Sequence, residues 1–208
     1  DNFVLNGNGH IVDGKNMSRL FAIGGNNVTL SNLILINGNA DNGGAVFTEG
    51  TVTLNNVTFI NNYASTRGGA VGFFTDLLVN INNSKFIDNS GGSGQSIYVD
   101  GGNLNIYNTG VNSNLHSKDG QVILKNAIGY MDNVTFANIV SDYVPAIRLE
   151  KSKALTVLNS KFVNLTANIT AGAFAIKSGG VIYIGNCEFT NTTSSKNANC
   201  LIAQKNGN

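Results

Sequence analysis

Proline, tryptophan and charged residues are scarce in this chain of 208 residues. It contains one proline and no tryptophan, and charged residues make up 12% of it. Glycine is frequent instead, with 25 residues, so strands and tight turns are favoured over helices. The formal net charge is +1 and no long basic or acidic run occurs. We therefore expect no nucleic-acid partner.

Long apolar runs and cysteines are also few. No stretch approaches the roughly 20 apolar residues that cross a bilayer, and the first residues lack the basic start and apolar run of a signal peptide. We expect no direct membrane insertion. Cys187 and Cys200 are too few for a disulfide framework. A disulfide across the last repeat and two free buried thiols are both open interpretations.

Asparagine recurs eight times at intervals of 24 to 27 residues, and each copy is followed three positions later by an apolar residue. The asparagines are Asn8, Asn32, Asn56, Asn83, Asn108, Asn133, Asn159 and Asn186. The apolar residues are Ile11, Leu35, Phe59, Phe86, Val111, Phe136, Phe162 and Phe189. A repeat of this length with a fixed apolar pattern is typical of stacked one-coil units.

Each unit contains three short stretches with apolar residues at every second position. In residues 51–76 two such stretches flank Asn56, and a third follows Gly68 and Gly69. A period of two predicts β-strands, and asparagine between two strands indicates a tight bend. The third stretch supplies one inward residue per unit: Phe21, Val46, Val71, Ile97, Val122, Ile147, Phe174 and Leu201.

These observations predict an all-β fold, a right-handed, single-stranded parallel β-helix of about eight coils with three short strands per coil. We expect residues 1–208 to form one domain, a segment of a longer surface protein. Asparagine tolerates the left-handed backbone region, and its amide both donates and accepts hydrogen bonds. The eight asparagines are therefore predicted to form an internal ladder that fixes the register of the coils. The alternative is a row of asparagines that binds sugar.

Two repeat motifs resemble those of a known group of proteins. Residues 56–62 (NVTFINN) with residues 68–71 (GGAV), and residues 133–138 (NVTFAN), resemble the repeats of adhesin-like surface proteins of methanogenic archaea. The polymorphic outer-membrane proteins of chlamydiae carry related repeats. Residues 7–14 (GNGHIVDG) are similar to the first coil of many pectin-lyase-like β-helices. The resemblance implies an extracellular, cell-surface adhesion or wall-associated module.

Polysaccharide lyases and hydrolases share this scaffold, so a catalytic site has to be sought in the residues. The best acidic candidates follow the third strand of three successive coils: Glu49, Asp76 and Asp100. The same column continues with Lys125, Glu150 and Lys177, and alternating charges indicate an exposed salt-bridge ladder. Arg148, a candidate proton-abstracting base, is interpreted as a solitary surface arginine.

The two histidines, His10 and His116, are four coils apart and cannot share a metal ion. We therefore predict no catalytic, metal or cofactor site, and a protein that is not an enzyme.

The outward side chains of the third strand are unusually apolar for a surface. Phe47, Tyr98, Ile123 and Arg148 form one outward column, and Tyr63 and Tyr143 stand in the loops that precede this strand. Exposed aromatic strips and loops on a rigid scaffold are candidate contact surfaces. The alternative interpretation is that neighbouring loops cover the column.

The leading hypothesis is a non-enzymatic cell-surface module. It would act as a rigid stalk that presents contact faces to a host or neighbouring cell, a glycan or a wall polymer. The second hypothesis is a surface filament or sheath subunit that stacks end to end with copies of itself. The third is a polysaccharide lyase or glycoside hydrolase.

Overall fold

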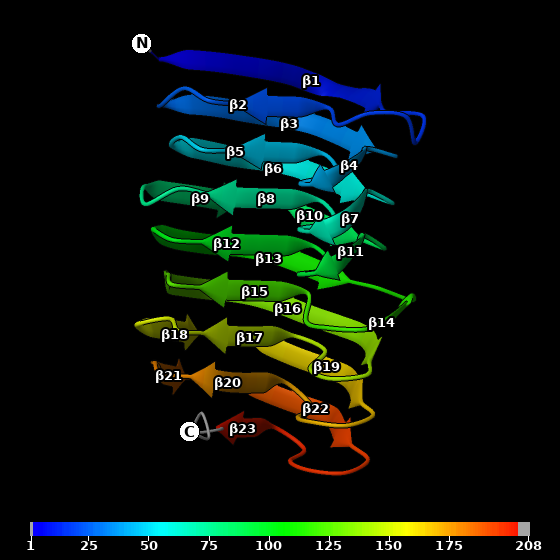
Figure 1. The fold of residues 1–208 in the computed structure, drawn as a ribbon, viewed down its shortest axis with the longest axis vertical. Coiled ribbons are helices and arrows are strands. Elements are labelled where there is room, and N and C mark those ends of the chain that lie inside the picture. Colours follow the sequence, from blue (N-terminus) through cyan, green and yellow to red (C-terminus); the bar gives the residue numbers. More distant parts are fainter. Residues whose placement is uncertain (1, 204–208) are drawn as a thin grey trace.

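The chain winds into a column of eight stacked coils (Figure 1). The structure is a computed structural model that describes residues 2–203. Every strand pair in it is parallel, and all strands belong to three sheets that run along the column. In Figure 1 the front strands run from right to left, the rear strands run from left to right, and the coils descend towards the C-terminus. This is the predicted right-handed winding.

The first two predicted strands of a coil lie in one 12-stranded sheet, because the chain passes through the asparagine bend without leaving the sheet. This sheet contains β1 (Phe3–Asp13), β3 (Val28–Ile36), β6 (Val52–Ile60), β9 (Leu78–Asn82), β10 (Lys85–Ile87), β13 (Asn103–Asn112), β14 (His116–Ser117), β16 (Ile128–Ser141), β18 (Ala154–Leu158), β19 (Lys161–Ala167), β21 (Val181–Gly185) and β22 (Glu188–Ser194).

The third strands form an eight-stranded sheet, and a three-stranded sheet lies in the loops of three coils. The eight-stranded sheet contains β2 (Phe21–Ile23), β5 (Val46–Thr48), β8 (Val71–Phe74), β12 (Ile97–Asp100), β15 (Val122–Lys125), β17 (Ile147–Glu150), β20 (Phe174–Ser178) and β23 (Leu201–Ala203). The three-stranded sheet contains β4 (Asn39–Asn42), β7 (Tyr63–Arg67) and β11 (Ser90–Ser93).

The inward columns form the core in the predicted register. The inward residues of the third strand pair coil to coil from Phe21 to Leu201. Phenylalanine rings stack inside the column, with centroids 4.7 Å apart for Phe59 and Phe86 and 5.3 Å apart for Phe136 and Phe162. Parallel strands place equivalent residues about 4.8 Å apart, so identical rings meet face to face without rearrangement.

Each predicted bend asparagine has a positive φ, between 49° and 55°. From Asn32 onward, each side-chain amide donates to the preceding coil over 2.7 to 3.2 Å, and the acceptor is the bend asparagine of that coil or a residue one or two positions before it. These side chains lie on the outer surface, so the expectation that they are internal is wrong. Leu54 and Val57 both point inward, and the two residues between them therefore point outward.

An internal ladder is present, but its members are Asn62 and Asn89. Each follows a residue with positive φ, Asn61 or Asp88, which makes a second bend in its coil. The amide of Asn62 donates to Asn89 Oδ1 over 3.0 Å and to the carbonyl of Leu35 over 3.0 Å, and both asparagines are buried. Asn89 in turn donates to the carbonyl of Phe59 over 3.0 Å. Buried amides that find all these partners fix one register, because a slipped coil would leave them unpaired.

The first coil departs from the predicted alignment. The register shifts between Asn6 and His10, so Ile11 pairs with Ile34 and Val12 pairs with Leu35. Val12 therefore packs against the core, whereas Ile11 is exposed. The cause is an irregular bend at Asn8 and Gly9, both with positive φ, that takes more residues than the later bends.

The two cysteines are free and half-buried, which answers the question that the sequence left open. Within the described residues, no helix has the length and apolar character needed to cross a membrane.

Replacing Asn108 with alanine is expected to lower the free energy of unfolding by about 1 to 2 kcal/mol. Asn108 has φ 49° and shares amide hydrogen bonds with Asn83 and Asn133. Asn108→Gly removes the same bonds but tolerates the backbone conformation, so it should cost less. Equilibrium urea unfolding of both variants is the measurement. Equal stability of the two would show that the backbone conformation is not under strain.

Candidate functional site

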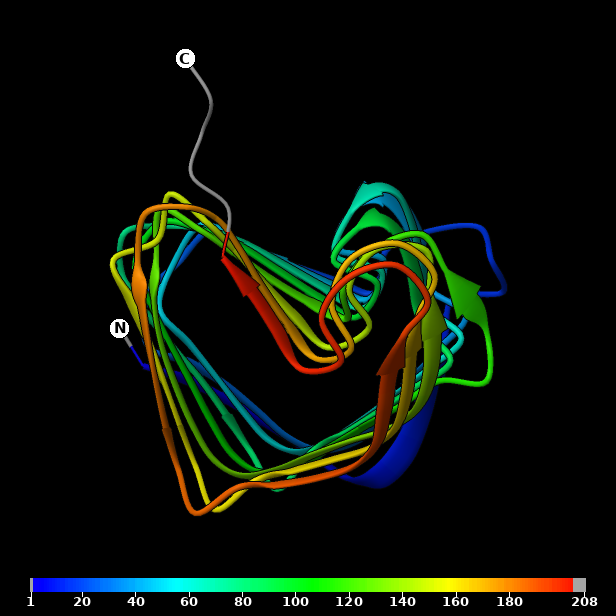
Figure 2. The ribbon, with the colours of Figure 1, turned by 90° about the horizontal axis from the view of Figure 1, so that it is seen from below.

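The loops that precede the third strands overhang one face of the column. Viewed along the axis, the chain of each coil leaves the 12-stranded sheet, hooks outward and turns back to enter the eight-stranded sheet (Figure 2). Outward side chains of the eight-stranded sheet contact residues of these loops in several coils: Arg148 pairs with Asp119, and the Arg67 guanidinium lies over the Tyr98 ring. We call the strip between this sheet and the loops the notch.

Aromatic rings fill the N-terminal half of the notch. Phe74 lies between Phe47 and Tyr98, with ring centroids 5.5 and 5.6 Å away. Phe74 reaches this place because Gly72, which occupies the outward position in its coil, has no side chain. Arg67 caps the rings, with its guanidinium 5.3 Å from the Tyr98 ring centroid. Burial raises the pKa of the Tyr98 hydroxyl above its usual value.

The predicted apolar strip is accordingly not a solvent-facing surface. Tyr98 and Ile123 are buried, and Phe47 is half-buried. The interpretation in which neighbouring groups cover the column is the correct one for these positions. The sequence pattern identifies the outward direction of a side chain, but it does not show what stands above it.

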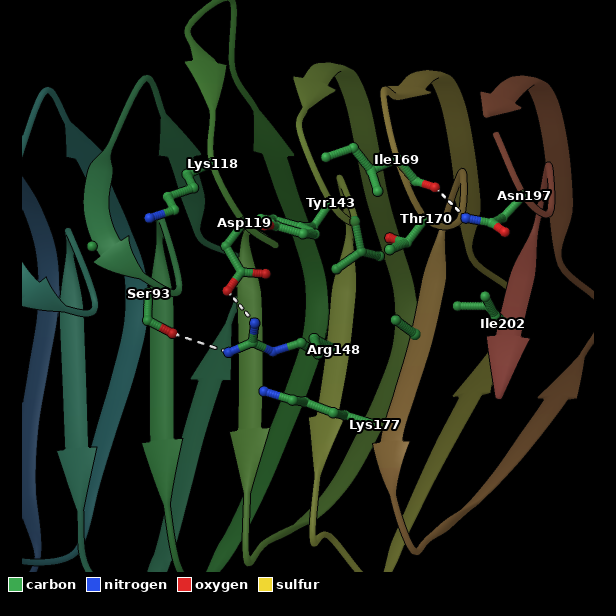
Figure 3. Close-up of a pocket in the computed structure, with 13 residues that line it drawn as sticks. Ser93, Lys118, Asp119, Tyr143, Arg148, Ile169, Thr170, Lys177, Asn197 and Ile202 are labelled. Atoms are coloured by element: carbon green, nitrogen blue, oxygen red, sulfur yellow. Dashed lines mark hydrogen bonds and ion pairs between the residues drawn. The ribbon is translucent and has the colours of Figure 1, made fainter. Parts of the chain in front are cut away.

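The C-terminal half of the notch is an open groove with a volume of about 650 Å³ (Figure 3). We call it the Arg148 groove. Its charged and polar lining residues are Ser93, Lys118, Asp119, Tyr143, Arg148, Thr170, Lys177 and Asn197. Its apolar lining residues are Val144, Ile169, Ala175 and Ile202. The outward residues of β20 and β23 in the groove are Ala175 and Ile202, whereas Phe47 and Tyr98 occupy this column in two of the earlier coils.

Arg148 connects the floor of the groove to its wall. Its guanidinium forms an ion pair with Asp119 through Nη1, and Nη2 donates to Ser93 Oγ over 3.3 Å (Figure 3). Nη2 also lies 3.7 Å from a carboxylate oxygen of Glu150. The side chains of Arg148 and Asp119 are 18% and 8% exposed. The prediction of a solitary surface arginine is therefore wrong.

Burial governs the ionisation of Asp119. It raises the pKa of this carboxyl above its usual value, although the Arg148 cation and the N–H of Gly120, which donates to Asp119 over 2.9 Å, both favour the charged form. Glu150 also contacts Lys177 over 3.5 Å. Arg148 thus contacts both Asp119 and Glu150, and Lys177 contacts Glu150, so the two acids are turned towards these cations.

The predicted charge ladder is confirmed in part, beside the groove. Lys125 pairs with Asp100 over 2.9 Å, and Lys177 pairs with Glu150. The hydrogen bond to Asp100 raises the pKa of Lys125. The predicted column of Glu49, Asp76 and Asp100 is wrong at Asp76. In the strand register Asp100 pairs with Phe74 and not with Asp76. Asp76 lies two residues further on, in the turn.

Tyr63 and the two histidines are not among the residues that line the Arg148 groove. Tyr63 is exposed on β7 in the three-stranded sheet. His116 stands on β14, with Nε2 3.1 Å from Asp142 Oδ1. His10 is on β1, and its Nδ1 lies 2.8 Å from the carbonyl oxygen of Gly7. Among the described residues, no three His, Cys, Asp or Glu side chains gather as metal ligands.

Of the predicted contact residues, the structure brings Arg148 and Tyr143 together in one groove. Sequence reasoning missed Asp119, Lys118 and Lys177 as their companions. The spacing of Lys118, Arg148 and Lys177, about one coil apart, was the available signal.

Comparison of the chain with protein-family models, with curated proteins and with solved structures gives no match.

Proposed function

We propose that the chain is a non-enzymatic module of a cell-surface protein. Its stacked coils serve as a rigid support, and the Arg148 groove is the contact site for a glycan or wall polymer on the same or a neighbouring cell. The observation that carries this proposal is an open groove that spans several coils and contains an exposed tyrosine, aliphatic side chains and hydrogen-bonding groups. Concave sites of this volume and mixed lining are typical ligand sites.

The column suits such a role because its parts resist relative movement. Coil-to-coil contacts combine backbone pairing in three sheets, stacked phenylalanines and amide ladders. A ligand that lies along the axis meets side chains from several coils whose spacing is set by strand pairing. The resemblance of the repeats to adhesin-like surface proteins supports an extracellular, cell-surface location.

Binding is favoured over catalysis by the arrangement of the acids. Asp119 is the one acidic residue among the described lining residues, and it is paired with Arg148. A glycoside hydrolase needs two carboxyl groups on opposite sides of the scissile bond, one to give a proton and one to act on water or the sugar. The groove presents one buried, paired carboxyl group instead.

Retention on insoluble surfaces tests this proposal. The purified chain is expected to be retained on at least one of cellulose, chitin, peptidoglycan, acidic wall polysaccharide or fixed microbial cells, without release of sugar. Tyr143→Ala should weaken retention about ten-fold, because exposed aromatic residues in a groove often dominate binding energy. Tyr63→Ala is the matched control, since Tyr63 and Tyr143 are 46% and 41% exposed and Tyr63 lies outside the groove.

Three outcomes would overturn the proposal. The first is an equal effect of the two tyrosine substitutions, and the second is no retention on any surface. The third is turnover of a polysaccharide that Asp119→Asn abolishes, which would make the groove a catalytic site.

A further inference from the structure

The Arg148 groove gathers cations that are far apart in the sequence. Lys118, Arg148 and Lys177 come from three successive coils and all line the groove. Lys118 stands at the wall and Arg148 on the floor, and Lys177 lies on β20 two residues after Ala175 (Figure 3). The net charge of +1 conceals this cluster, because the 12 acidic residues are distributed along the whole chain.

The charge that a ligand would meet in the groove is positive. Lys118 and Lys177 are exposed, whereas Asp119 is buried and Glu150 is half-buried. Asp119 faces Arg148, and Glu150 contacts Arg148 and Lys177 from the side. Among the ion pairs of the described residues, none includes Lys118. An anionic ligand therefore complements the accessible charge, and a cationic ligand is repelled.

The arrangement of the groove favours a saccharide over a peptide. An extended peptide binds best along an unpaired strand edge. The floor strands β17 and β20 are paired on both sides within the eight-stranded sheet. The two lining strands that end a sheet, β11 and β23, are only four and three residues long, so they offer little edge to an extended peptide. The groups left for a ligand are mainly side chains: the lysine ammonium groups, the exposed Tyr143 and the amide of Asn197, which already donates to the carbonyl of Ile169. An aromatic face with flexible donors suits a sugar ring and its substituents.

We propose that the Arg148 groove binds a linear anionic polysaccharide that lies along the axis of the column. Lys118 and Lys177 contact carboxylate or sulfate groups of the chain, and Tyr143 packs against a sugar ring. Arg148 is a positioning residue that holds Asp119 and Glu150 away from the ligand. Strand pairing repeats about every 4.8 Å along the axis, so a polymer with regularly spaced charges meets cations from successive coils. This inference rests on the proposed role of the groove as a contact site and assigns its ligand class.

Calorimetric titration with defined oligosaccharides tests the ligand class. The probes are oligogalacturonates and chondroitin sulfate oligomers as carboxylated and sulfated arms, cellohexaose and mannohexaose as neutral arms, and polyglutamate as an acidic peptide. We expect one of the anionic saccharides to bind more tightly than the neutral ones and polyglutamate, with affinity that falls as salt is added. Tighter binding of a neutral saccharide or of polyglutamate, or no binding by any probe, would overturn the inference.

A pair of double variants with equal change in net charge tests the residues. Lys118→Gln/Lys177→Gln should weaken binding of the anionic saccharide about ten-fold, since each exposed charge contact contributes up to about 1 kcal/mol. The control is Lys85→Gln/Lys161→Gln, because both of these lysines are exposed on the 12-stranded sheet. Equal weakening by the two double variants would reduce the effect to net charge and contradict the assignment.

A groove-filling variant tests the location of the site. Ala175→Trp places a large ring on the floor of the groove and should abolish saccharide binding, with the circular dichroism spectrum unchanged.

Surface retention and saccharide titration together separate this inference from the proposed function. If surface retention depends on Tyr143 but survives both the lysine substitutions and competing anionic saccharide, the ligand class is wrong and the contact role stands. If anionic saccharides bind the groove but no surface retains the chain, the surface role is wrong and the ligand class stands.

Discussion

Phe136→Ala is expected to lower the free energy of unfolding by about 3 to 5 kcal/mol, the usual cost of removing a buried phenylalanine. Phe136 is fully buried, and its ring stacks on Phe162 with centroids 5.3 Å apart and planes 6° from parallel. Parallel pairing on both sides holds the backbone of this coil in place. The cavity left by the ring therefore has little opportunity to collapse. We expect the measured loss to include both the lost burial of the ring and the cost of the empty cavity.

Equilibrium unfolding in urea measures this effect. A shift of the urea midpoint reports the change in stability if the dependence of the unfolding free energy on urea concentration, the slope, is unchanged. Tyr183→Ala removes a ring of similar size from an exposed position on β21 and should change stability by less than about 0.5 kcal/mol. A loss below about 1 kcal/mol for Phe136→Ala would contradict the continuous core. A changed slope would indicate that the coils unfold separately, as happens in some repeat proteins.

Arg148→Met is expected to be the most damaging substitution in the groove, with a loss of about 2 to 4 kcal/mol of unfolding free energy. It keeps the apolar length of the side chain but leaves the buried Asp119 carboxylate without its cation. Breaking a fully buried ion pair costs about 3 to 5 kcal/mol. We expect a somewhat smaller loss here because the side chain of Arg148 is 18% exposed. Lys177→Met is the control, since this lysine is exposed and its pair with Glu150 should contribute less than about 1 kcal/mol.

The double variant Arg148→Met/Asp119→Leu distinguishes a lost attraction from an uncompensated charge. It removes both charges, so it should be more stable than Arg148→Met alone. A double-mutant cycle from thermal or urea unfolding gives the coupling energy. If the double variant is as unstable as the sum of the two single variants, the two side chains do not interact as the geometry indicates.

The architecture could be predicted because the pattern within each repeat specifies local structure over a few residues. Apolar residues at every second position on either side of Asn56 specify strand, bend and strand within a few residues. Stacking like on like then follows, since each coil offers its neighbour the same pattern. The prediction failed at Ile11, where an irregular bend around Gly9 changes the register. Spacing from an asparagine cannot reveal how many residues a bend consumes.

The location of the amide ladder was harder to predict than its existence. Periodicity shows which residues flank Asn56, but the direction of a side chain at a positive φ depends on the bend geometry. Leu54 and Val57 take the inward places, so the bend asparagine points to solvent. Asn62 and Asn89, which no periodic rule distinguished, are the amides of the buried ladder.

The amino-acid sequence by itself determined the strands, the left-handed bends and the inward columns of this protein, because these follow from local periodicity and from what asparagine and glycine allow. Only the tertiary structure decided what covers the outer face. Tyr98 is buried beside Phe74, while Arg148 meets Asp119 across a hook of the chain. Such contacts join residues about a coil apart through loops without a period, and the path of those loops is set by packing.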